Sequence, residues 1–353
     1  MTGGLVDLQV NGFAGVDFNA ADDSPALTAE TLDFALEAML ATGVTCCLPT
    51  VITAPLEVLA RRLHTLDAAI AKSRLGPLMC PGYHLEGPFL NPAPGYTGCH
   101  PPGAMLAPDF DVIQALGARL QRPILMLTLA PELAGSTACI AAVRRAGMLA
   151  AIGHSAASTD TVTRAGSAGA TLSTHLGNGL PPLMAKLDNP IFAQLSDDRL
   201  CASFIADGIH VPPFALKAMI RAKGPGRAFL VTDATAAAAA APGVYRFADL
   251  TVTRDADGAV RVPGALGLAG SSLCLDAAVR NLIQWGIAAP DDALAMASTV
   301  PAAALAPALD AFGITLPESA VDWWPGPYPA RVRVGTVERC FVKSCVEGVP
   351  VHG

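Results

Sequence analysis

The chain has 353 residues; 52% of them are hydrophobic, only 15% are charged, and the formal net charge is −7. This length allows one large α/β domain or two ordinary ones, since a (β/α)8 barrel needs about 250 residues. The negative charge and the lack of a basic cluster argue against nucleic acid as a partner. We also expect no membrane span and a cytoplasmic location, because the chain shows neither a run of about 18 apolar residues nor a secretory leader.

The nine cysteines are an odd number, include the neighbours Cys46 and Cys47, and form no C-x2-C pair. This pattern favours reduced, mostly buried thiols over a disulfide framework or a thiolate zinc site. Any metal would therefore be held by histidines and carboxylates.

Short apolar segments alternate with helix-like stretches from residue 5 to residue 232. The alternation is typical of repeated βα units and predicts strands at 5–10, 45–51, 82–86, 124–129, 149–153, 171–174, 200–206 and 228–232. A first helix, capped by Thr28, is predicted from an apolar face of Leu32, Ala35, Leu36 and Met39, and further helices from 55–75 and 136–146. Eight strands of this kind predict a closed parallel barrel of the TIM type.

The rest of the chain has a different pattern. Residues 243–262 resemble an antiparallel hairpin, helices are predicted at 273–285 and 291–305, and residues 330–351 contain strand-like alternation at Val332 and Val334. We therefore expect a barrel formed by residues 5–242 and 264–310. Residues 243–263 and 311–353, with 1–4, are expected to form a small, reduced β-sandwich subdomain.

Polar residues follow several of the predicted barrel strands. Glu86 ends the third strand, His154 follows the fifth, His175 the sixth and Asp233 the eighth. The carboxyl ends of barrel strands meet at one face, so these side chains would converge there. A single histidine at a strand end is more often a capping or packing residue. With polar residues at four strand ends, a metal site becomes about as credible as these structural roles.

Two imidazoles and a glutamate are a common ligand set of catalytic zinc. A divalent metal lowers the pKa of bound water toward about 7, and Asp233 would then be placed to take and return a proton.

The motifs at these strand ends occur in a characteristic order: His84–Phe89, Gly153–Ser155, Thr174–Leu176, Ala206–His210 and Val231–Ala234. In this order they resemble the N-acetylglucosamine-6-phosphate deacetylases of the amidohydrolase superfamily, from about Val6 to Leu305. The resemblance implies a barrel with a small β-sandwich. It also implies that Glu86, His154 and His175 bind the metal.

The same resemblance assigns further roles. Asp233 matches the catalytic acid/base, and His100 matches the histidine that helps to polarise the amide carbonyl. His210 matches the residue that reaches the sugar or its phosphate, with Asn178 and Gly179 contributing nearby contacts. His84 is interpreted as a core or supporting residue and His64 as a solvated one.

The first strand carries Gln9-Val10-Asn11, where amidohydrolases with two metals usually have His-x-His. Amides are poor zinc ligands beside imidazole and carboxylate. We therefore expect one divalent metal per site, with zinc as the expected ion.

The chain departs from the family beside the expected sugar site. Leu176 is followed by Gly177-Asn178-Gly179-Leu180, whereas family members commonly have an aromatic residue, Asn, Ala and Met. Lys186 aligns with an arginine that family members offer to the substrate phosphate across a dimer interface. Lysine can still pair with phosphate, but as a point charge without a bidentate fork. These departures suggest a shifted substrate, either a 6-phosphate epimer or an unphosphorylated sugar.

The expected function is a metal-dependent amidohydrolase that removes the N-acetyl group from an amino sugar. The expected substrate is N-acetylglucosamine 6-phosphate or a closely related N-acetylhexosamine, the products are acetate and the free amino sugar, and the expected assembly is a homodimer. Two alternatives stay open: a hydrolase of another N-acyl compound or of a cyclic amide, and a catalytically silent binding or regulatory barrel.

Overall fold

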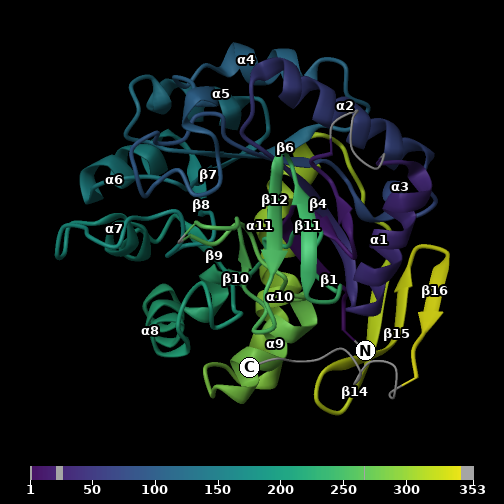
Figure 1. The fold of residues 1–353 in the computed structure, drawn as a ribbon. Helices are drawn as coiled ribbons and strands as arrows, with labels where there is room; N and C mark the ends of the chain where they lie inside the picture. Colours follow the sequence, from purple (N-terminus) through teal and green to yellow (C-terminus); the bar gives the residue numbers. More distant parts are fainter. Residues whose placement is uncertain (1, 21–26, 266, 343–353) are drawn as a thin grey trace.

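The computed structural model describes residues 2–20, 27–265 and 267–342. Its central element is a parallel sheet ringed by helices (Figure 1). The sheet contains eight strands in chain order: β1 (Leu5–Val10), β4 (Val44–Ile52), β5 (Tyr83–Glu86), β6 (Ile124–Leu129), β7 (Leu149–Ile152), β8 (Ala170–Ser173), β9 (Cys201–Phe204) and β10 (Ala228–Leu230). The predicted barrel and its eight strands are confirmed, with boundaries that shift by a few residues.

These strands are apolar runs because both of their faces are covered. Every residue of β1, β4 and β6 is buried. A parallel strand has side chains of the barrel interior on one face and the surrounding helices on the other, so both of its faces favour apolar residues. The sequence therefore shows continuous apolar segments here instead of the alternation of a half-exposed strand.

The surrounding helices present one apolar stripe to the sheet. In α1 (Ala29–Ala41), Thr28 caps the first turn and the predicted face is buried. The other helices are α2 (Leu56–Lys72), α3 (Gly76–Met79), α4 (Phe110–Gly117), α5 (Ser136–Arg145), α6 (Thr159–Ala168), α7 (Pro190–Ser196), α8 (Pro213–Lys223), α9 (Leu275–Gln284), α10 (Pro290–Ala297) and α11 (Thr299–Ala311). Short 3-10 turns, η1 (Pro102–Ala104) and η2 (Pro225–Arg227), complete the helical elements of the described residues.

One predicted helix ends early and another is divided in the structure. The helix predicted at 55–75 stops at Ser73, whose hydroxyl donates to Asp33 Oδ1 (2.8 Å) and accepts from the backbone N–H of Gly76 (2.7 Å). The helix predicted at 291–305 is interrupted at Ser298, before Pro301. Because proline has no N–H and its ring crowds the carbonyl four residues earlier, Pro301 favours the break at Ser298 between α10 and α11.

The α10–α11 segment is also apolar enough to be compared with a membrane span. One helical stretch in the described part of the chain, Pro290–Ala311, has sufficient length and hydropathy, and 44% of its most apolar window is buried. Both helices pack against β1 and β10. A core helix passes the same test, so the composition of this segment is explained by its place in the barrel's outer layer.

The barrel closes through a short connection that we call the closing seam, residues 9–12 and 231–235. Here the strand ladder between β10 and β1 is replaced by bonds beyond the end of β10. Asp233 N–H donates to the Gln9 carbonyl (2.9 Å), and Asn11 N–H donates to the Ala234 carbonyl (2.7 Å). The seam therefore places Asp233 directly beside the end of the first strand.

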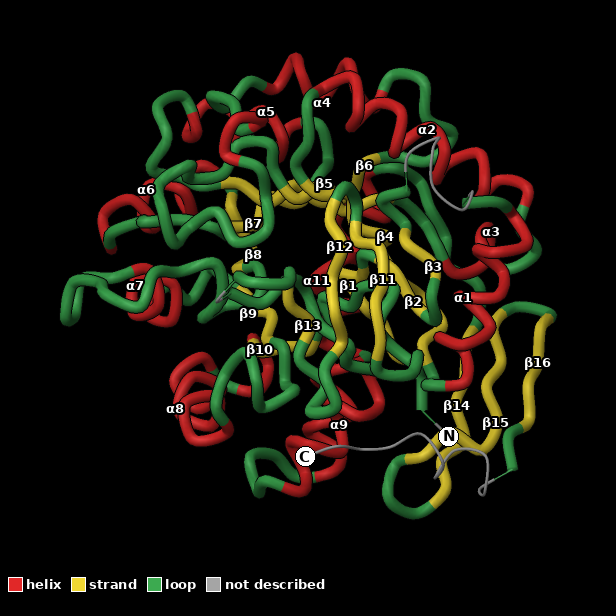
Figure 2. Tube along the Cα trace, viewed as in Figure 1, coloured by secondary structure: helices red, strands yellow, loops and turns green. Residues whose placement is uncertain are grey.

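An antiparallel sheet lies across the barrel mouth (Figures 1 and 2). It consists of β11 (Gly243–Phe247), β12 (Leu250–Arg254) and β13 (Val260–Arg261), which confirms the predicted hairpin. Its apolar face, including Phe247 and Val252, packs on Ile52 of β4. The hairpin tip is fixed by a bond from Ala248 N–H to Asp17 Oδ2 (2.7 Å).

The C-terminal strands form a separate sheet. It contains β14 (Ser319–Trp324), β15 (Tyr328–Val334) and β16 (Val337–Cys340), and Thr2 pairs with Val321 of β14. Val332 and Val334 are buried, as the alternation predicted. A two-stranded ribbon, β2 (Gly12–Phe13) with β3 (Val16–Asp17), follows the first barrel strand. The division into a barrel and one β subdomain stays a prediction, and its residues 1 and 343–353 lie outside the described part of the chain.

Candidate metal centre and active site

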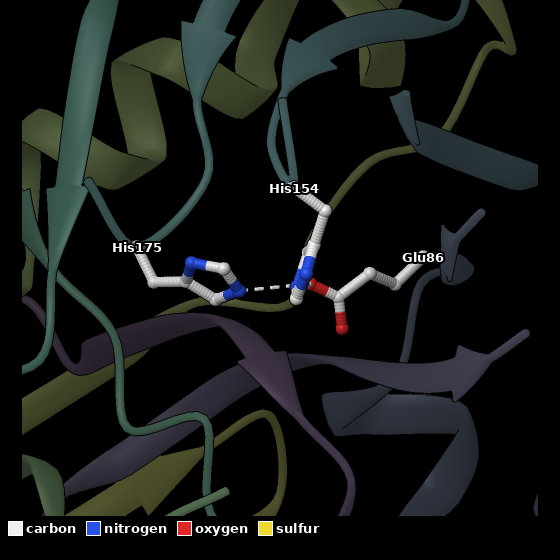
Figure 3. A group of neighbouring side chains, drawn as sticks. All are labelled: Glu86, His154 and His175. Carbon is white, nitrogen blue, oxygen red and sulfur yellow. Dashed lines mark hydrogen bonds and ion pairs between the residues drawn. The ribbon is translucent and has the colours of Figure 1, made fainter. Parts of the chain in front are cut away.

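Glu86, His154 and His175 converge at the carboxyl end of the barrel (Figure 3). Glu86 is the last residue of β5, while each histidine follows the end of its strand by two residues. The Nε2 atom of His175 lies 2.9 Å from Glu86 Oε1, and that of His154 lies 3.3 Å from the same oxygen. One potential ligand atom from each residue falls within 4.8 Å of the others.

The backbone at this edge is strained in a way that aims the side chains inward. His154, His175 and Asp233 have φ values of 51°, 30° and 48°, in the left-handed region that non-glycine residues rarely adopt. Such residues cost about 1–3 kcal/mol each and persist only where their surroundings hold them. The N–H of His175, for example, donates to Ser203 Oγ at 2.7 Å.

The protonation pattern of the trio suits a metal. Nδ1 of His154 donates to the Tyr96 carbonyl (2.7 Å), which leaves Nε2 as the nitrogen with a free lone pair. Burial raises the pKa of Glu86, but the close contacts of its carboxylate with the imidazoles of His154 and His175 outweigh burial and hold that pKa well below its usual range. A buried carboxylate beside two imidazoles fits a divalent cation, and zinc accepts this donor set.

A third imidazole, that of His100, lies against the trio. Its ring centroid is 4.6 Å from that of His154, and its Nε2 is 3.6 Å from Glu86 Oε2. Thr53 Oγ1 donates to the Glu86 carbonyl (3.0 Å), so it must accept from Nδ1 of His100 (3.0 Å). Burial and the charge of His154 lower the pKa of His100 to about 3.

Asp233 is held by amides from the first strand. Asn11 Nδ2 donates to Asp233 Oδ1 at 2.7 Å, and Gln9 Nε2 lies 3.2 Å from the same oxygen and 3.1 Å from Glu86 Oε1. Burial and the charge of Glu86 raise the pKa of Asp233 to about 6. From the sequence, Gln9 and Asn11 were predicted only to be non-ligands; their place at a strand end was the available signal for this second role.

Glu132 connects two loops of the site and was not predicted from the sequence. It follows β6 and accepts from Asn91 Nδ2 (2.7 Å), Ser155 Oγ (2.6 Å) and the Ala156 N–H (2.6 Å). Asn91 N–H in turn donates to the His154 carbonyl (3.1 Å). One carboxylate therefore joins the loop after β5 to the loop that carries His154.

A cavity of about 310 Å³ opens above these groups. Its size is at the lower end of the range of about 300–1,000 Å³ for small-molecule sites. The cavity brings together all but one of the predicted site residues, namely Glu86, His100, His154, His175, Asn178, Gly179, His210 and Asp233. Cys99, beside His100, and Phe247, from the hairpin, also line it and were not predicted.

Lys186 is the exception. It is exposed and does not line the cavity of its own chain. The glycines beside Asn178 have distinct surroundings: a Cβ on Gly179 would lie 2.6 Å from His154 Nδ1, whereas one on Gly177 would meet Met219 and Val211 at 3.3 Å. Gly179 therefore leaves room for the His154 ring as well as for a ligand.

The remaining histidines of interest lie where the sequence placed them. His84 is fully buried below the trio, with Nε2 2.7 Å from Thr128 Oγ1, and burial lowers its pKa to about 4. His64 is exposed on α2. A smaller cavity of about 170 Å³ near Gly4 and Thr45, at the amino ends of the strands, has no histidine or carboxylate in its lining.

The cysteines are mostly buried thiols. Among the described residues none is paired in a disulfide; Cys46, Cys47, Cys80, Cys139 and Cys274 are buried, and Cys340 is exposed. None belongs to the group that could bind a metal.

Known proteins resemble this chain in sequence and in architecture. The chain is 33% identical to N-acetylgalactosamine-6-phosphate deacetylase of Escherichia coli O157:H7, over 84% of this chain and 76% of the relative. It is 34% identical to the bovine (Bos taurus) N-acetylglucosamine-6-phosphate deacetylase, over 85% of this chain and 73% of the relative. The chain belongs to the N-acetylglucosamine-6-phosphate deacetylase family. A scan against models of protein families gave no match.

Solved structures of this family agree with the fold. A point mutant of the Mycobacterium smegmatis N-acetyl-D-glucosamine-6-phosphate deacetylase, in complex with N-acetyl-D-glucosamine-6-phosphate, has a TM-score of 0.78 and 30% identity, covering 94% of this chain and 84% of the other. The Pasteurella multocida N-acetylglucosamine-6-phosphate deacetylase has a TM-score of 0.81 and 27% identity, covering 96% and 86%. As a member of this family, the chain is an amidohydrolase with a barrel fold and a site compatible with a metal.

Proposed function

We propose that the chain removes the N-acetyl group from an N-acetylhexosamine 6-phosphate and releases acetate and the amino sugar. The observation that carries this proposal is the buried Glu86–His154–His175 group beside Asp233 in one cavity. Both relatives named above are deacetylases of N-acetylhexosamine 6-phosphates. A silent binding barrel would have no chemical need for this combination of ligands and a buried acid/base.

Glu86, His154 and His175 would hold one divalent metal, with zinc as the proposed ion. When bound, the metal would polarise the amide carbonyl and lower the pKa of water toward about 7. Asp233 Oδ1 is occupied by the amides of Asn11 and Gln9, so Oδ2 is the oxygen that accepts a proton from water. The same carboxyl would then protonate the departing amine.

His100 would act at the substrate carbonyl, and its hydrogen bonds constrain that role. Thr53 fixes a proton on Nδ1, so Nε2 faces the cavity without a proton in the neutral ring. To donate to a carbonyl oxygen, the ring must be an imidazolium. Because burial and His154 lower the pKa of His100 to about 3, this form requires negative charge developing on the carbonyl oxygen to stabilise it.

The sugar would lie against His210, Asn178 and Gly179, which line the cavity. Lys186 would meet the 6-phosphate from a partner subunit, because it is exposed and outside its own cavity. Relatives with gluco and galacto names match this chain about equally. The configuration at carbon 4 therefore stays open between these two sugars.

Turnover of a substrate panel tests the proposal. The panel contains N-acetylglucosamine, N-acetylgalactosamine, the 6-phosphate of each sugar, an N-acetyl amino acid and a cyclic amide, and acetate or amine release is measured. We expect a 6-phosphate to have the highest kcat/KM. Preference for a free sugar would contradict the phosphate assignment, and absence of amide turnover with metal bound would favour the binding barrel.

The Asp233→Asn variant tests the catalytic assignment. Because an amide cannot accept the proton from water, we expect kcat to fall by at least about a hundredfold. Elemental analysis should still find one metal per chain, since the three proposed ligands are unchanged. A near-normal rate would refute the role of Asp233, and two metals per fully active chain would refute the single-metal site.

The proposed assembly is a homodimer located in the cytoplasm. The loop before α7 extends away from the barrel and carries Lys186 between Leu183 and Leu187, which are 88% and 69% exposed (Figure 1). Large apolar side chains at this exposure favour a protein contact.

A further inference from the structure

Asp207 makes a compact set of hydrogen bonds just beyond β9. Its Oδ1 accepts from the backbone N–H groups of Ile209 and His210, both at 2.8 Å. Its Oδ2 lies 2.6 Å from Nδ1 of His210. The side chains of Asp207 and His210 are only 10% and 7% exposed. The carboxylate therefore fixes both the loop and the ring that the loop carries.

These contacts determine which nitrogen of His210 carries a proton. Burial raises the pKa of Asp207, but the hydrogen bonds from the His210 ring and from the backbone N–H groups of His210 and Ile209 outweigh burial and keep the pKa below its usual range. An ionised carboxylate can only accept hydrogen bonds, so Nδ1 of His210 must be the donor. Nε2 is then the nitrogen left for the cavity that His210 lines.

The loop that carries Asp207 and His210 is held by contacts with Asn281 and Trp285. Asn281 Nδ2 of α9 donates to the Ala206 carbonyl at 2.8 Å. Gly208 has φ +77°, and a Cβ there would lie 3.2 Å from the Trp285 ring. The loop that carries the Asp207–His210 pair therefore packs against α9 and Trp285 on one side, and His210 lines the cavity on the other.

We propose that Asp207 is a positioning residue that keeps the proton on Nδ1 of His210 and presents the unprotonated Nε2 as a hydrogen-bond acceptor to a hydroxyl of the amino-sugar substrate. An ionised phosphate oxygen has no proton to donate, so a sugar hydroxyl is the group that matches this nitrogen. The inference rests on the proposed function for the substrate class. Its core, the control of the His210 tautomer by Asp207, is independent of that function.

Asp207→Asn is a nearly isosteric test. The amide oxygen can replace Oδ1 as acceptor for the two backbone N–H groups, while the NH2 group takes the place of Oδ2. His210 Nδ1 must then accept, and the neutral ring moves its proton to Nε2. Nitrogen-15 NMR of labelled histidines should show Nδ1–H in the unchanged protein and Nε2–H in the variant, with His210→Gln identifying the signal.

Kinetics test whether this tautomer matters for the substrate. With the preferred 6-phosphate sugar we expect Asp207→Asn to raise KM by about tenfold or more and to change kcat less, by analogy with residues that orient a functional histidine. In a His210→Gln background, Asp207→Asn should have little further effect. Asp109→Asn, which alters an exposed helix cap outside the cavity, should leave both constants unchanged.

The same constants with the free sugar test this contact. A KM penalty for both sugars is expected for a hydroxyl, and a penalty confined to the phosphorylated sugar would contradict the proposed acceptor role of Nε2. Additive effects of Asp207→Asn and His210→Gln, or an unchanged tautomer in Asp207→Asn, would overturn the proposal. If the wild-type chain turns over no amino sugar, the proposed function fails, and the NMR comparison alone decides the role of Asp207.

Discussion

At the scale of single residues, the hydrogen bond between Thr53 and His100 limits what this histidine can do. Its Nε2 is bare in the neutral ring and lies 3.6 Å from Glu86 Oε2, so it could act on a carbonyl as the imidazolium or serve as another metal ligand. The two roles predict different effects of His100 on metal binding. A carbonyl-directed His100 is dispensable for metal binding, whereas a ligand is not.

The His100→Asn variant separates the two roles. We expect metal content to stay at one per chain and kcat to fall by about a hundredfold to a thousandfold, the usual cost of losing a donor to a developing oxyanion. The measurements are elemental analysis and steady-state kinetics on the same preparation. Loss of metal in proportion to loss of activity would identify His100 as a ligand instead.

Gly179 offers a second test at this scale. Its φ is +62°, and an added Cβ would lie 2.6 Å from His154 Nδ1, so Gly179→Ala must move the ring or the loop. We expect metal affinity to fall by about tenfold to a hundredfold, measured by chelator competition. Gly224→Ala is the matched control, because Gly224 also has positive φ but open space around it. Equal affinities in the two variants would contradict this account.

At the scale of elements, β1 contributes a buried acid as well as the seam amides. Asp7 accepts from Thr232 Oγ1 at 2.6 Å, and burial raises its pKa from 3.8 to about 7. The folded state thus binds a proton that the unfolded state releases above pH 3.8. This contribution to stability is complete below that pH and is lost as the pH rises through about 7.

The Asp7→Asn variant should remove this pH dependence. Between pH 5 and pH 8 we expect the wild type to lose on the order of 2 kcal/mol of stability through this group, and the variant to lose less. The measurement is the difference in melting temperature between the two pH values for each protein. The idea would fail if wild type and variant showed the same difference.

The elements also show what the sequence could predict. The barrel strands were recognisable because they are buried on both faces, and α1 because Thr28 and its apolar stripe are local signals. The breaks at Ser73 and in the closing seam were not, since they depend on partners distant in sequence: Asp33 for Ser73, and Gln9 for Asp233. The Glu86–His154–His175 group was predicted from strand ends and family motifs. The supporting hydrogen bonds of Gln9, Glu132 and Asp207 could be recognised only in the folded structure.

At the scale of the whole molecule, large apolar side chains gather on α7, α8 and the loop before α7. They are Leu183, Leu187, Phe192 and Phe214, each more than half exposed. Helices α7 and α8 pack together, and the loop carries Lys186. If a second copy covers this surface, association and recognition of the phosphate depend on the same segment.

The double variant Leu183→Asp/Leu187→Asp tests this arrangement. We expect a dimer in the wild type and a monomer in the variant by light scattering after size-exclusion chromatography. Turnover of the 6-phosphate sugar should fall more than that of the free sugar. Phe34→Asp, which changes an exposed apolar side chain on α1, is the control and should stay dimeric. A monomeric wild type would refute the assembly.

The closing seam joins β10 to β1 by hydrogen bonds beyond the end of β10 instead of by a strand ladder. Elsewhere neighbouring strands are held by ladders, but the ring is completed by the few bonds that also set Asp233 beside Gln9 and Asn11. The segment that closes the barrel thus also carries Asp233, the proposed acid/base. A substitution in the closing seam therefore alters the closure of the barrel and the position of the Asp233 carboxylate together.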